Sequence, residues 1–498
     1  AVSPEQEIVY GDQVRFDYRT LQVRIGQLAG LLTSLGVGHG DTVAVMDWDS
    51  NRYLEAYFAV PMIGAVLMMV NVRLAPEQIA YTLNHSGARV ILANREFLPL
   101  LDAIDEQLPD LRTRILLDDA GGPLPPGFAT EYEAGLRGAT PVVRFPDFDE
   151  NARATVFYTT GTTGLPKGVY FSHRQLVLHS LAAMAALGGA PRQGRLHRDD
   201  VYMPITPMFH VHAWGLPYVA TAMGIRQVYP GRYLPAKLLA LIAREKVTFS
   251  HCVPTILHML LEHPDAAQTD LEGWKVIIGG AALPRALAQR ALARGIDIFG
   301  GYGMSETCPL LTIAQIDVDS VTDADEVLSL RTKAGIPVPL VDLRIVDPDM
   351  GDVAHDGIAT GEVVARAPWL TQGYLHDPEA SATLWAGGYL HTGDIGNIDE
   401  AGYLRVTDRI KDVIKTGGEW ISSLALEDII ALHPAVSEVA VIGIADTKWG
   451  ERPLPLVVRK PGSHVAEAEI IELVAARSRS LRDRRRHGMA RIGEAVDE

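Results

Sequence analysis

Cysteine is scarce in this chain, which has only Cys252 and Cys308 among its 498 residues. Two cysteines are too few for a disulfide framework, and they lie too far apart in sequence for a metal-binding knuckle. Disulfide-poor chains are typical of reducing compartments. We therefore expect a cytoplasmic location.

Positive charge is also in short supply, because 45 Lys and Arg stand against 61 Asp and Glu, for a net charge of −16. A nucleic-acid-binding domain normally presents a basic face, so we do not expect a nucleic-acid partner. An anionic small molecule remains compatible with this composition. Backbone N–H groups and a few cations bind phosphate locally, whatever the net charge.

Long uninterrupted apolar runs are missing as well. Two long uncharged runs, 56–72 and 201–225, are broken by prolines such as Pro61, Pro204 and Pro207. A membrane-spanning helix needs about 20 consecutive apolar residues. We therefore expect no transmembrane segment and interpret both runs as buried helix and strand pieces.

What the chain does have is alternation. From residue 40 to 310, short β-branched runs alternate with amphipathic stretches, which predicts α/β layers of mostly parallel sheets. Gly- and Asp-bounded strands predict a β-rich subdomain over about 335–410, the end of a large N-terminal domain at 1–410. Residues 411–498 predict a small C-terminal α+β domain. The predicted strands are 42–46, 89–92, 247–252 and 276–278, and the predicted helices are 53–60, 78–85, 235–245 and 284–293.

The strongest motif is Thr-Thr-Gly-Thr-Thr-Gly-Leu-Pro-Lys-Gly at 159–168, between apolar strands that we expect at 155–158 and 169–171. Glycines let the backbone turn its N–H groups inward, threonines add donors, and Lys167 adds a charge for phosphate. It is not a Walker loop, which has Gly before the Lys and Ser or Thr after it. A plain Gly/Thr-rich turn is the alternative, and the order of ten residues argues against it.

With this motif the sequence resembles the adenylate-forming superfamily of acyl-CoA synthetases, firefly-type luciferases and peptide-synthetase adenylation domains. Within it, the chain is most similar to medium- and long-chain fatty acyl-CoA synthetases, over about residues 10–460. The resemblance implies a large α/β domain, a small mobile C-terminal domain and a loop that holds the β- and γ-phosphates of ATP. The loop residues are Thr159, Thr160, Gly161, Thr162, Thr163, Gly164 and Lys167.

A second motif, Gly-Tyr-Gly-Met-Ser-Glu-Thr, covers 301–307. A tyrosine offers a flat face to a base, and a carboxylate beside a phosphate site suits Mg²⁺. The resemblance implies that Tyr302 packs against adenine and that Thr307 contacts the α-phosphate. It also makes Glu306 and Thr160 ligands of Mg²⁺, although Glu306 alone could be a solvated turn residue. The remaining implied nucleotide contacts are Gly280, Ala281, Ala282, Gly301, Gly303 and Met304.

Asp394 and Arg409 form a third candidate pair. An acidic group suits a ribose diol and an arginine suits a hydroxyl or phosphate, although either could be a solvated turn residue. The resemblance implies that Asp394 binds the ribose hydroxyls with help from Arg409, and that a hinge lies near Lys411. It also implies a loop that enters the active site for thioester formation, with Lys415, Gly417, Gly418, Glu419 and Trp420.

The segment Pro-Met-Phe-His-Val-His-Ala-Trp-Gly at 207–215 is uncharged and carries two histidines. A buried His or Trp is more often a core residue than a functional one. The resemblance implies that His210 lies by the acid's carboxylate and the α-phosphate, and that Trp214 gates a fatty-acid tunnel. The residues assigned to catalysis are thus Lys167, His210, Glu306, Arg409 and Lys415.

These implied roles predict an AMP-forming acid–thiol ligase with ATP, Mg²⁺ and coenzyme A. It would activate a medium- or long-chain fatty acid to acyl-AMP and pass the acyl group to CoA, releasing AMP and pyrophosphate. Two alternatives stay open: the same chemistry on a short, branched, sulfur-bearing or aryl acid, and a non-catalytic homologue that binds nucleotide or acyl groups. The resemblance also implies a possible homodimer through the large domain.

One feature departs from the family. The family normally ends with a Pro-x-Thr-x-x-Gly-Lys segment, whose lysine contacts the carboxylate and the α-phosphate during adenylation. This sequence stops at Glu498, about where that segment would begin, and it starts as if in the middle of a domain. We therefore expect the C-terminal domain to be truncated here and the full protein to be longer.

Overall fold

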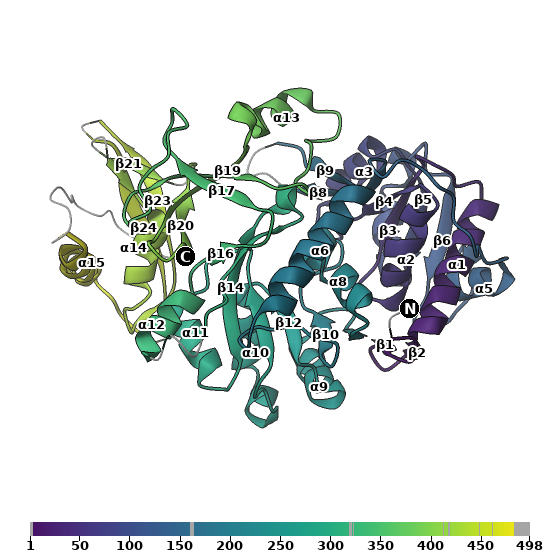
Figure 1. The fold of residues 1–498 in the computed structure, drawn as a ribbon, viewed down its shortest axis with the longest axis horizontal. Helices are drawn as coiled ribbons and strands as arrows, with labels where there is room; N and C mark the ends of the chain where they lie inside the picture. The colour runs from purple at the N-terminus through teal and green to yellow at the C-terminus, as the bar shows by residue number, and fades with distance from the viewer. Residues whose placement is uncertain are drawn as a thin grey trace. The chain divides into compact units, whose positions relative to one another are not determined.

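The computed structural model describes residues 3–159, 164–317, 321, 323–411, 413–416, 419–447, 449–460 and 462–482. The chain divides into two compact units (Figure 1). Unit 1 comprises Ala1–Asp342 and Ala365–Leu390, and unit 2 comprises Leu343–Val364 and His391–Glu498. The boundary that we predict between residues 410 and 411 lies inside unit 2, and the predicted domain limits remain a proposal.

The first sheet of unit 1 has the order β7-β6-β5-β3-β4-β8-β9. All neighbours are parallel except β8 and β9, which form an antiparallel pair. β3 and β4 are buried at every residue, as expected for parallel strands covered on both faces. The strands are β3 (Thr42–Met46), β4 (Val66–Met69), β5 (Ala88–Asn94), β6 (Thr113–Leu117), β7 (Thr130–Glu131), β8 (Arg153–Thr159) and β9 (Lys167–Ser172).

The second sheet of unit 1 has the order β16-β15-β14-β13-β12-β10-β11-β1-β2. Its centre is parallel, and β2, β15 and β16 add antiparallel edges. The expectation of mostly parallel α/β sheets is therefore confirmed. The strands are β1 (Glu7–Tyr10), β2 (Val14–Asp17), β10 (Val201–Pro204), β11 (Arg226–Tyr229), β12 (Phe249–Cys252), β13 (Lys275–Ile278), β14 (Asp297–Gly303), β15 (Leu310–Ile313) and β16 (Ile336–Pro337).

Helices cover these sheets, and α6 and α8 lie between the two (Figure 1). The helix predicted at 235–245 is α9, which starts with Pro at its first position, where the missing N–H has no helical partner to lose. Its stripe at Leu238, Leu239 and Ile242 joins the core of the second sheet. The longer helices are α1 (Tyr18–Ser34), α2 (Asn51–Met62), α3 (Pro76–His85), α6 (His173–Gly189), α8 (Leu216–Met223), α9 (Pro235–Glu245), α10 (Pro254–Glu262), α11 (Arg285–Leu292) and α12 (Ala324–Arg331).

The shorter helical pieces of unit 1 lie mostly in its connections. The run 56–72 forms the end of α2 and β4, and the run 201–225 forms β10, α7 and α8, as expected. No helix in the described part of the chain is long and apolar enough to cross a bilayer. The short pieces are α4 (Leu98–Ala103), α5 (Tyr132–Gly138), α7 (Val211–Trp214), α13 (Pro378–Leu384), η1 (Arg95–Phe97), η2 (Asp105–Gln107), η3 (Pro264–Gln268), η4 (Ser305–Thr307) and η5 (Ala386–Gly388).

Unit 2 contains two four-stranded sheets, β17-β18-β19-β20 and β22-β21-β24-β23. Ile414, Ile430, Val441 and Ile470 form a core between the second sheet and two helices. The expected β-rich and α+β character of this region is thus observed in its strands and helices. They are β17 (Asp342–Val346), β18 (Gly361–Arg366), β19 (Leu390–Ile398), β20 (Leu404–Arg409), β21 (Ile414–Thr416), β22 (Glu419–Ile421), β23 (Val436–Asp446), β24 (Gly450–Arg459), α14 (Ser423–Ile430) and α15 (Glu467–Arg482).

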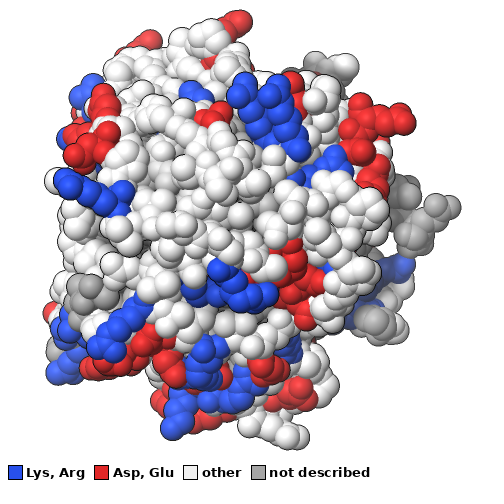
Figure 2. All heavy atoms as spheres, turned by 90° about the vertical axis from the view of Figure 1, so that its right-hand side faces the viewer, with Lys and Arg blue, Asp and Glu red and all other residues white. Residues whose placement is uncertain are grey.

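Charge is mixed on the face of the molecule that Figure 2 shows. Lys and Arg side chains lie next to Asp and Glu side chains there rather than in a separate patch. On this face the two signs of charge are therefore interspersed.

Candidate functional site

The phosphate motif joins two paired strands. β8 ends at Thr159 and β9 begins at Lys167, and these two residues are register partners. Thr160, Gly161, Thr162 and Thr163 lie outside the described residues. Gly164 has φ = +103°, a conformation that side-chain-bearing residues rarely adopt, so the glycine at this turn has a backbone reason. The structure therefore places Thr159 and Lys167 side by side at the base of the loop.

Lys167 is exposed, and its Nζ lies over the ring of Tyr374 at 4.7 Å from the centroid. The chain around Tyr374 also pairs with β9, because Leu375 donates its N–H to the carbonyl of Gly168 at 2.8 Å. Tyr374 is not among the site residues that we predict from the sequence. A Gly-Tyr pair in a loop carries little signal by itself, and only the fold brings it to the phosphate motif.

Glu306 lies in η4, directly after β14, and is only 6% exposed. Its Oε1 accepts a hydrogen bond of 2.7 Å from the hydroxyl of Tyr374, and its carbonyl accepts one of 2.9 Å from Thr371 N–H. Burial and the Glu306 carboxylate raise the pKa of Tyr374, so this hydroxyl stays protonated and donates. Lys167 and Glu306, predicted from separate motifs, are thus connected through one tyrosine.

The donor chemistry at Glu306 fits magnesium. Mg²⁺ prefers oxygen ligands and is usually held by one or two carboxylates together with substrate phosphates. Among the described residues there is no cluster of three or more His, Cys, Asp or Glu that would hold a metal without such phosphates. Glu306 supplies one carboxylate, and the predicted second ligand, Thr160, lies outside the described residues.

The predicted adenine wall forms at the ends of β13 and β14. Gly280, Ala281 and Ala282 follow β13 and are exposed, whereas Gly301, Tyr302 and Gly303 end β14 and Met304 caps η4. Thr307 is fully buried, and its hydroxyl bonds to backbone groups of Met304 and Pro309. To contact the α-phosphate as predicted, the Thr307 hydroxyl would have to give up one of these backbone hydrogen bonds. This contact remains a prediction.

The predicted acyl segment has an unusual backbone. Val211, His212, Ala213 and Trp214 all have φ between +46° and +59°, so α7 is a left-handed turn. For L-residues this conformation costs roughly 1–2 kcal/mol per residue. Such backbone persists only where the surrounding structure holds it, and it is concentrated at functional sites.

His210 and Trp214 flank this turn. His210 is reached by solvent, yet surrounding protein atoms and the positive charge of Arg73 lower its pKa. Trp214 is half-buried, with its ring 4.9 Å from that of His251. It also abuts Gly279, just before the predicted adenine wall.

Buried polar contacts hold the turn in place. His212 is buried among Tyr57, Phe157 and Phe171, and its Nε2 lies 2.8 Å from Thr155 Oγ1 on β8. Burial lowers the pKa of His212 to about 3, so the ring is neutral near pH 7. His212 therefore serves as an anchor of the turn and not as a charged group.

The loop after β3 anchors the same segment from the other side. Asp49 is buried and accepts hydrogen bonds from the backbone N–H of Met208, at 2.8 Å, and from the hydroxyl of Tyr233. Burial raises the pKa of Asp49 to about 7. Tyr57 donates its hydroxyl to the Met208 carbonyl, so both backbone groups of Met208 are held just before His210.

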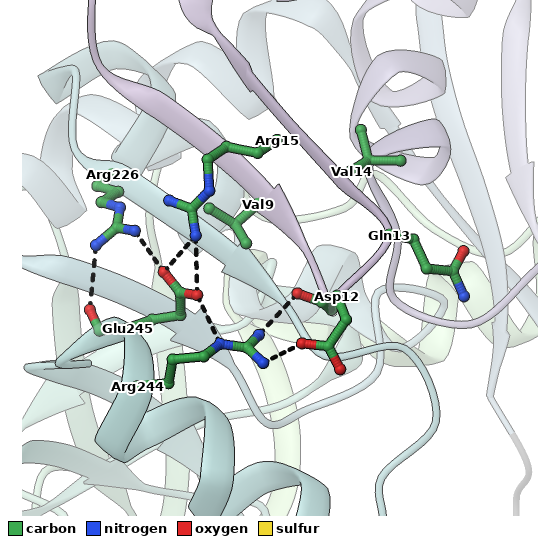
Figure 3. Close-up of a pocket in the computed structure, with 9 residues that line it drawn as sticks. Val9, Asp12, Gln13, Val14, Arg15, Arg226, Arg244 and Glu245 are labelled. Carbon is green, nitrogen blue, oxygen red and sulfur yellow. Dashed lines mark hydrogen bonds and ion pairs between the residues drawn. The ribbon is translucent and has the colours of Figure 1, made fainter.

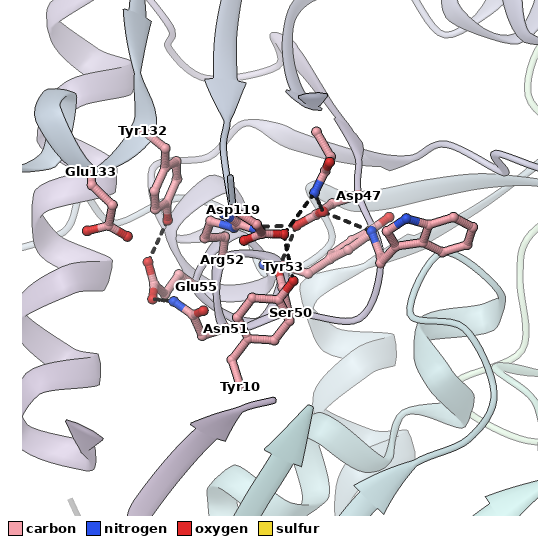
Figure 4. Close-up of polar contacts among 12 residues, drawn as sticks. Tyr10, Asp47, Ser50, Asn51, Arg52, Tyr53, Glu55, Asp119, Tyr132 and Glu133 are labelled. Carbon is pink, nitrogen blue, oxygen red and sulfur yellow. Dashed lines mark hydrogen bonds and ion pairs between the residues drawn. The ribbon is translucent and has the colours of Figure 1, made fainter. Parts of the chain in front are cut away.

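Behind this loop lies a buried polar cluster (Figure 4). Asp47 accepts from Ser50 Oγ at 2.6 Å and pairs with Arg52, which also pairs with Asp119 at 2.9 Å. Tyr10 of β1 donates to Asp119 at 2.8 Å. The cluster thereby ties β1 of the second sheet to the carboxyl end of β3 in the first. It fixes the scaffold from which Asp49 reaches the acyl segment.

A separate pocket of about 510 Å³ lies where the β1–β2 turn meets α9 (Figure 3). Arg15, Arg226 and Arg244 converge there on the buried carboxylate of Glu245. These cations lower the pKa of Glu245, and Arg244 also pairs with Asp12. Each arginine is thus paired with acid, and none of the predicted site residues lines this pocket. We interpret it as an ion-pair cluster that joins the turn to the sheet.

The remaining candidates lie in unit 2. Asp394 on β19 and Arg409 on β20 are register partners, with Arg409 Nε 3.3 Å from Asp394 Oδ1. The structure thus brings this predicted pair together, with the carboxylate buried and the guanidinium exposed. In the predicted thioester loop, Lys415 lies on β21 and Glu419 and Trp420 lie on β22. Their side chains, together with Gly417 and Gly418, lie outside the described part of the structure.

Comparisons with known proteins agree with this geometry. Residues 1–375 match the family model of the AMP-binding enzymes, and residues 425–487 match that of the AMP-binding enzyme C-terminal domain. A long-chain-fatty-acid–CoA ligase of Thermus thermophilus is 44% identical, over 90% of this chain and 81% of the relative. A 3-methylmercaptopropionyl-CoA ligase of Ruegeria lacuscaerulensis is 38% identical, over 93% of this chain and 86% of the relative.

Among solved structures, an anthranilate CoA ligase in complex with anthranoyl-AMP aligns with a TM-score of 0.83 at 25% identity, covering 100% of this chain and 91% of that one. The family models span most of the chain, and the relatives share well over 30% of their residues with it. The chain therefore belongs to the AMP-binding enzyme family and is an AMP-forming acid–CoA ligase.

Proposed function

We propose that the chain activates a medium- or long-chain fatty acid with ATP and transfers the acyl group to coenzyme A. The observation that carries the site assignment is the connection of Lys167 and Glu306 through Tyr374. A site that binds a nucleoside triphosphate with Mg²⁺ needs a cation close to the phosphates and a carboxylate close to the metal ion. The fatty-acid substrate is supported by the Thermus relative, which carries that activity in its name.

The proposed reaction needs no protein nucleophile. A carboxylate oxygen of the acid attacks the α-phosphorus of ATP, the bond to pyrophosphate breaks, and acyl-AMP forms. The CoA thiol then attacks the acyl carbonyl, loses its proton to solvent and displaces AMP. We assign Lys167 to the phosphates, Glu306 to Mg²⁺, and His210 to the acid's carboxylate. Positioning and charge stabilisation account for the catalysis.

Other predicted roles belong to the same proposal. We assign Tyr302 and the 280–282 turn to adenine, and Asp394 with Arg409 to the ribose. Bound Mg²⁺ would neutralise phosphate charge. The hinge near Lys411 and the thioester role of the loop at 415–420 rest on the resemblance. So does a homodimer through the large unit, which sedimentation would test. The proposed cytoplasmic location rests on Cys252 and Cys308, which are buried and unpaired.

A second candidate substrate class has its own support. The Ruegeria relative is named for a short, sulfur-bearing acid, and the aligned solved structure for an aryl acid. The acyl segment is bordered by aromatic rings, such as those of Trp214, His251 and Tyr202, rather than by aliphatic chains alone. An aryl or thioether acid would pack against such rings.

An acid-dependent assay of AMP and pyrophosphate release tests the proposal. We expect activity with ATP, Mg²⁺ and CoA to peak on medium or long chains in a ladder from acetate to palmitate, with cinnamate, benzoate and 3-methylmercaptopropionate beside it. A peak on a short, sulfur-bearing or aryl acid would keep the chemistry and change the substrate. If ATP binds but no AMP is released with any of these acids, the enzyme assignment is contradicted.

Single substitutions test the site. Lys167→Ala and Glu306→Ala should each lower kcat/KM for ATP by about 10²–10³-fold, as expected for groups that stabilise developing charge. Lys237→Ala on α9, which removes a lysine outside the proposed site, is the matched control and should retain activity. Unchanged activity in Lys167→Ala would exclude its assigned role.

A further inference from the structure

Tyr374 contacts both groups that the proposed function places on the triphosphate. Its hydroxyl donates to Glu306 Oε1 at 2.7 Å, and its ring lies under the ammonium of Lys167 at 4.7 Å. Within unit 1 these contacts come from three separate segments of the chain: β9, η4 and the loop before α13. We propose that Tyr374 is a positioning residue that orients Glu306 for the metal ion and sets the resting place of Lys167 beside it. This inference rests on the proposed function.

The loop that carries Tyr374 is itself firmly attached. Thr371 donates its N–H to the Glu306 carbonyl at 2.9 Å and its hydroxyl to the Tyr170 carbonyl at 2.8 Å. Gln175 of α6 donates to the Leu370 carbonyl at 2.5 Å. The loop therefore connects the backbone of β9 to that of η4, and Tyr374 makes the same connection through its side chain. A side chain held in this way can fix the separation of the groups it contacts.

The two contacts have distinct consequences. A neutral donor to one carboxylate oxygen fixes the carboxylate's rotation, and outer partners of metal ligands typically change metal affinity by about 10–100-fold when removed. A ring beneath an ammonium attracts the cation without neutralising it, so the lysine keeps its charge for phosphate. Removing the hydroxyl alone should affect the metal ion, and removing the ring should affect the nucleotide as well.

Binding measurements without turnover separate these effects. With ATP but no acid or CoA, the affinity of the full chain for Mn²⁺ can be followed by the electron paramagnetic resonance of free Mn²⁺. Tyr374→Phe keeps the ring and should weaken Mn²⁺ binding by about tenfold. The dissociation constant of ATP measured with EDTA present should stay within about twofold. Tyr374→Leu removes the ring too, and should also weaken metal-free ATP binding by several-fold.

The chain offers a matched control. Tyr389 also donates its hydroxyl to a carboxylate, that of Asp342 at 2.8 Å, and its ring lies 4.1 Å from the guanidinium carbon of Arg366. Tyr389→Phe makes the same chemical change at a tyrosine outside the proposed site, and should leave Mn²⁺ affinity unchanged. The thermal melting temperature of each variant shows whether it is folded. If Tyr374→Phe does not fold, Tyr374→His, which keeps a ring and a donor, takes its place and should bind Mn²⁺ more tightly than Tyr374→Leu.

Glu306→Gln separates this inference from the proposed function. If Glu306→Gln loses Mn²⁺ affinity and Tyr374→Phe does not, Tyr374 does not orient the carboxylate and the inference is overturned. If neither variant changes Mn²⁺ affinity, the assignment of Glu306 to the metal ion fails first. If both weaken binding while Tyr389→Phe does not, the positioning role is supported.

Discussion

At the scale of single residues, Trp214 of the acyl segment lies against Gly279, directly before the 280–282 turn that we assign to adenine. A Cβ at Gly279 would lie 2.9 Å from Trp214 Cη2 and 3.1 Å from the Gly301 carbonyl oxygen. Real Cβ atoms essentially never lie as close to another atom as the first of these distances, and the second is tighter than most real contacts. The indole can therefore occupy its observed position only because residue 279 has no side chain.

Gly279→Ala should accordingly displace the Trp214 ring. We expect a loss of about 1–3 kcal/mol in the free energy of unfolding, as for other overpacked sites. The KM for the acid should change more than the KM for ATP, because the displaced ring lies in the acyl segment. Gly189→Ala at the end of α6, where a Cβ meets nothing within 4 Å, is the matched control. Equal stability and equal acid KM in the two variants would contradict this account.

At the scale of the element, α7 shows how a strained turn is maintained. Four residues in the left-handed region carry a conformational cost that anchors on both sides must offset. Asp49 and Tyr57 hold Met208 before the turn, and Thr155 holds His212 within it. All three anchors come from the first sheet and the loop and helix that follow β3, so that side of unit 1 determines the geometry of the acyl segment.

Thr155→Val tests this dependence. The substitution keeps the shape of the side chain and removes the hydroxyl, leaving a buried imidazole nitrogen without its partner. We expect a stability loss of about 1–3 kcal/mol. The acid KM should also rise, at nearly constant KM for ATP, as the turn relaxes. Thr155→Ser, which restores the hydroxyl, should recover the acid KM. A rise in both KM values, or no recovery with Ser, would argue against a role specific to the turn.

At the scale of the whole molecule, buried histidines couple stability to pH. Burial lowers the pKa of His179, His212 and His251 to about 3, against about 6.5 in an unfolded chain. Between these values the unfolded chain binds more protons, so the free energy of unfolding falls as pH drops below 6.5, by about 1.4 kcal/mol per pH unit for each histidine. The raised pKa of Asp49 makes its own contribution to the free energy of unfolding larger as the pH falls. Because three histidines act in the other direction, the net free energy of unfolding still decreases.

Proton uptake on unfolding checks this expectation directly. At pH 5 the three histidines are neutral in the folded chain and charged in the unfolded one, so unfolding in urea should take up a proton at each. His251→Gln, which is neutral at every pH, should take up about one proton fewer than the parent chain. The same uptake in both chains would mean that His251 is already charged when folded.

The sequence predicts the layers of unit 1 well because long-range burial and local pattern agree there. The strand at 42–46 and the helix at 235–245 are apolar at the required spacing and appear with those bounds. The two nucleotide motifs of unit 1 are local, so their residues are visible in sequence. Tyr374, Asp49 and Thr155 are not, because their partners lie far along the chain. A left-handed turn at 211–214 is also invisible in sequence, since none of its residues is glycine.

The position of β1 has a consequence for how the chain is made. This strand lies inside the nine-stranded sheet, with Ile8 paired to Gln227 of β11. A ribosome adds about 5–20 residues per second, so the partner strand emerges some 10–40 s after β1. During that interval β1 can pair with β2, but a two-stranded hairpin is marginal in water by itself. Biogenesis of this enzyme therefore includes a waiting period in which chaperones have access to β1.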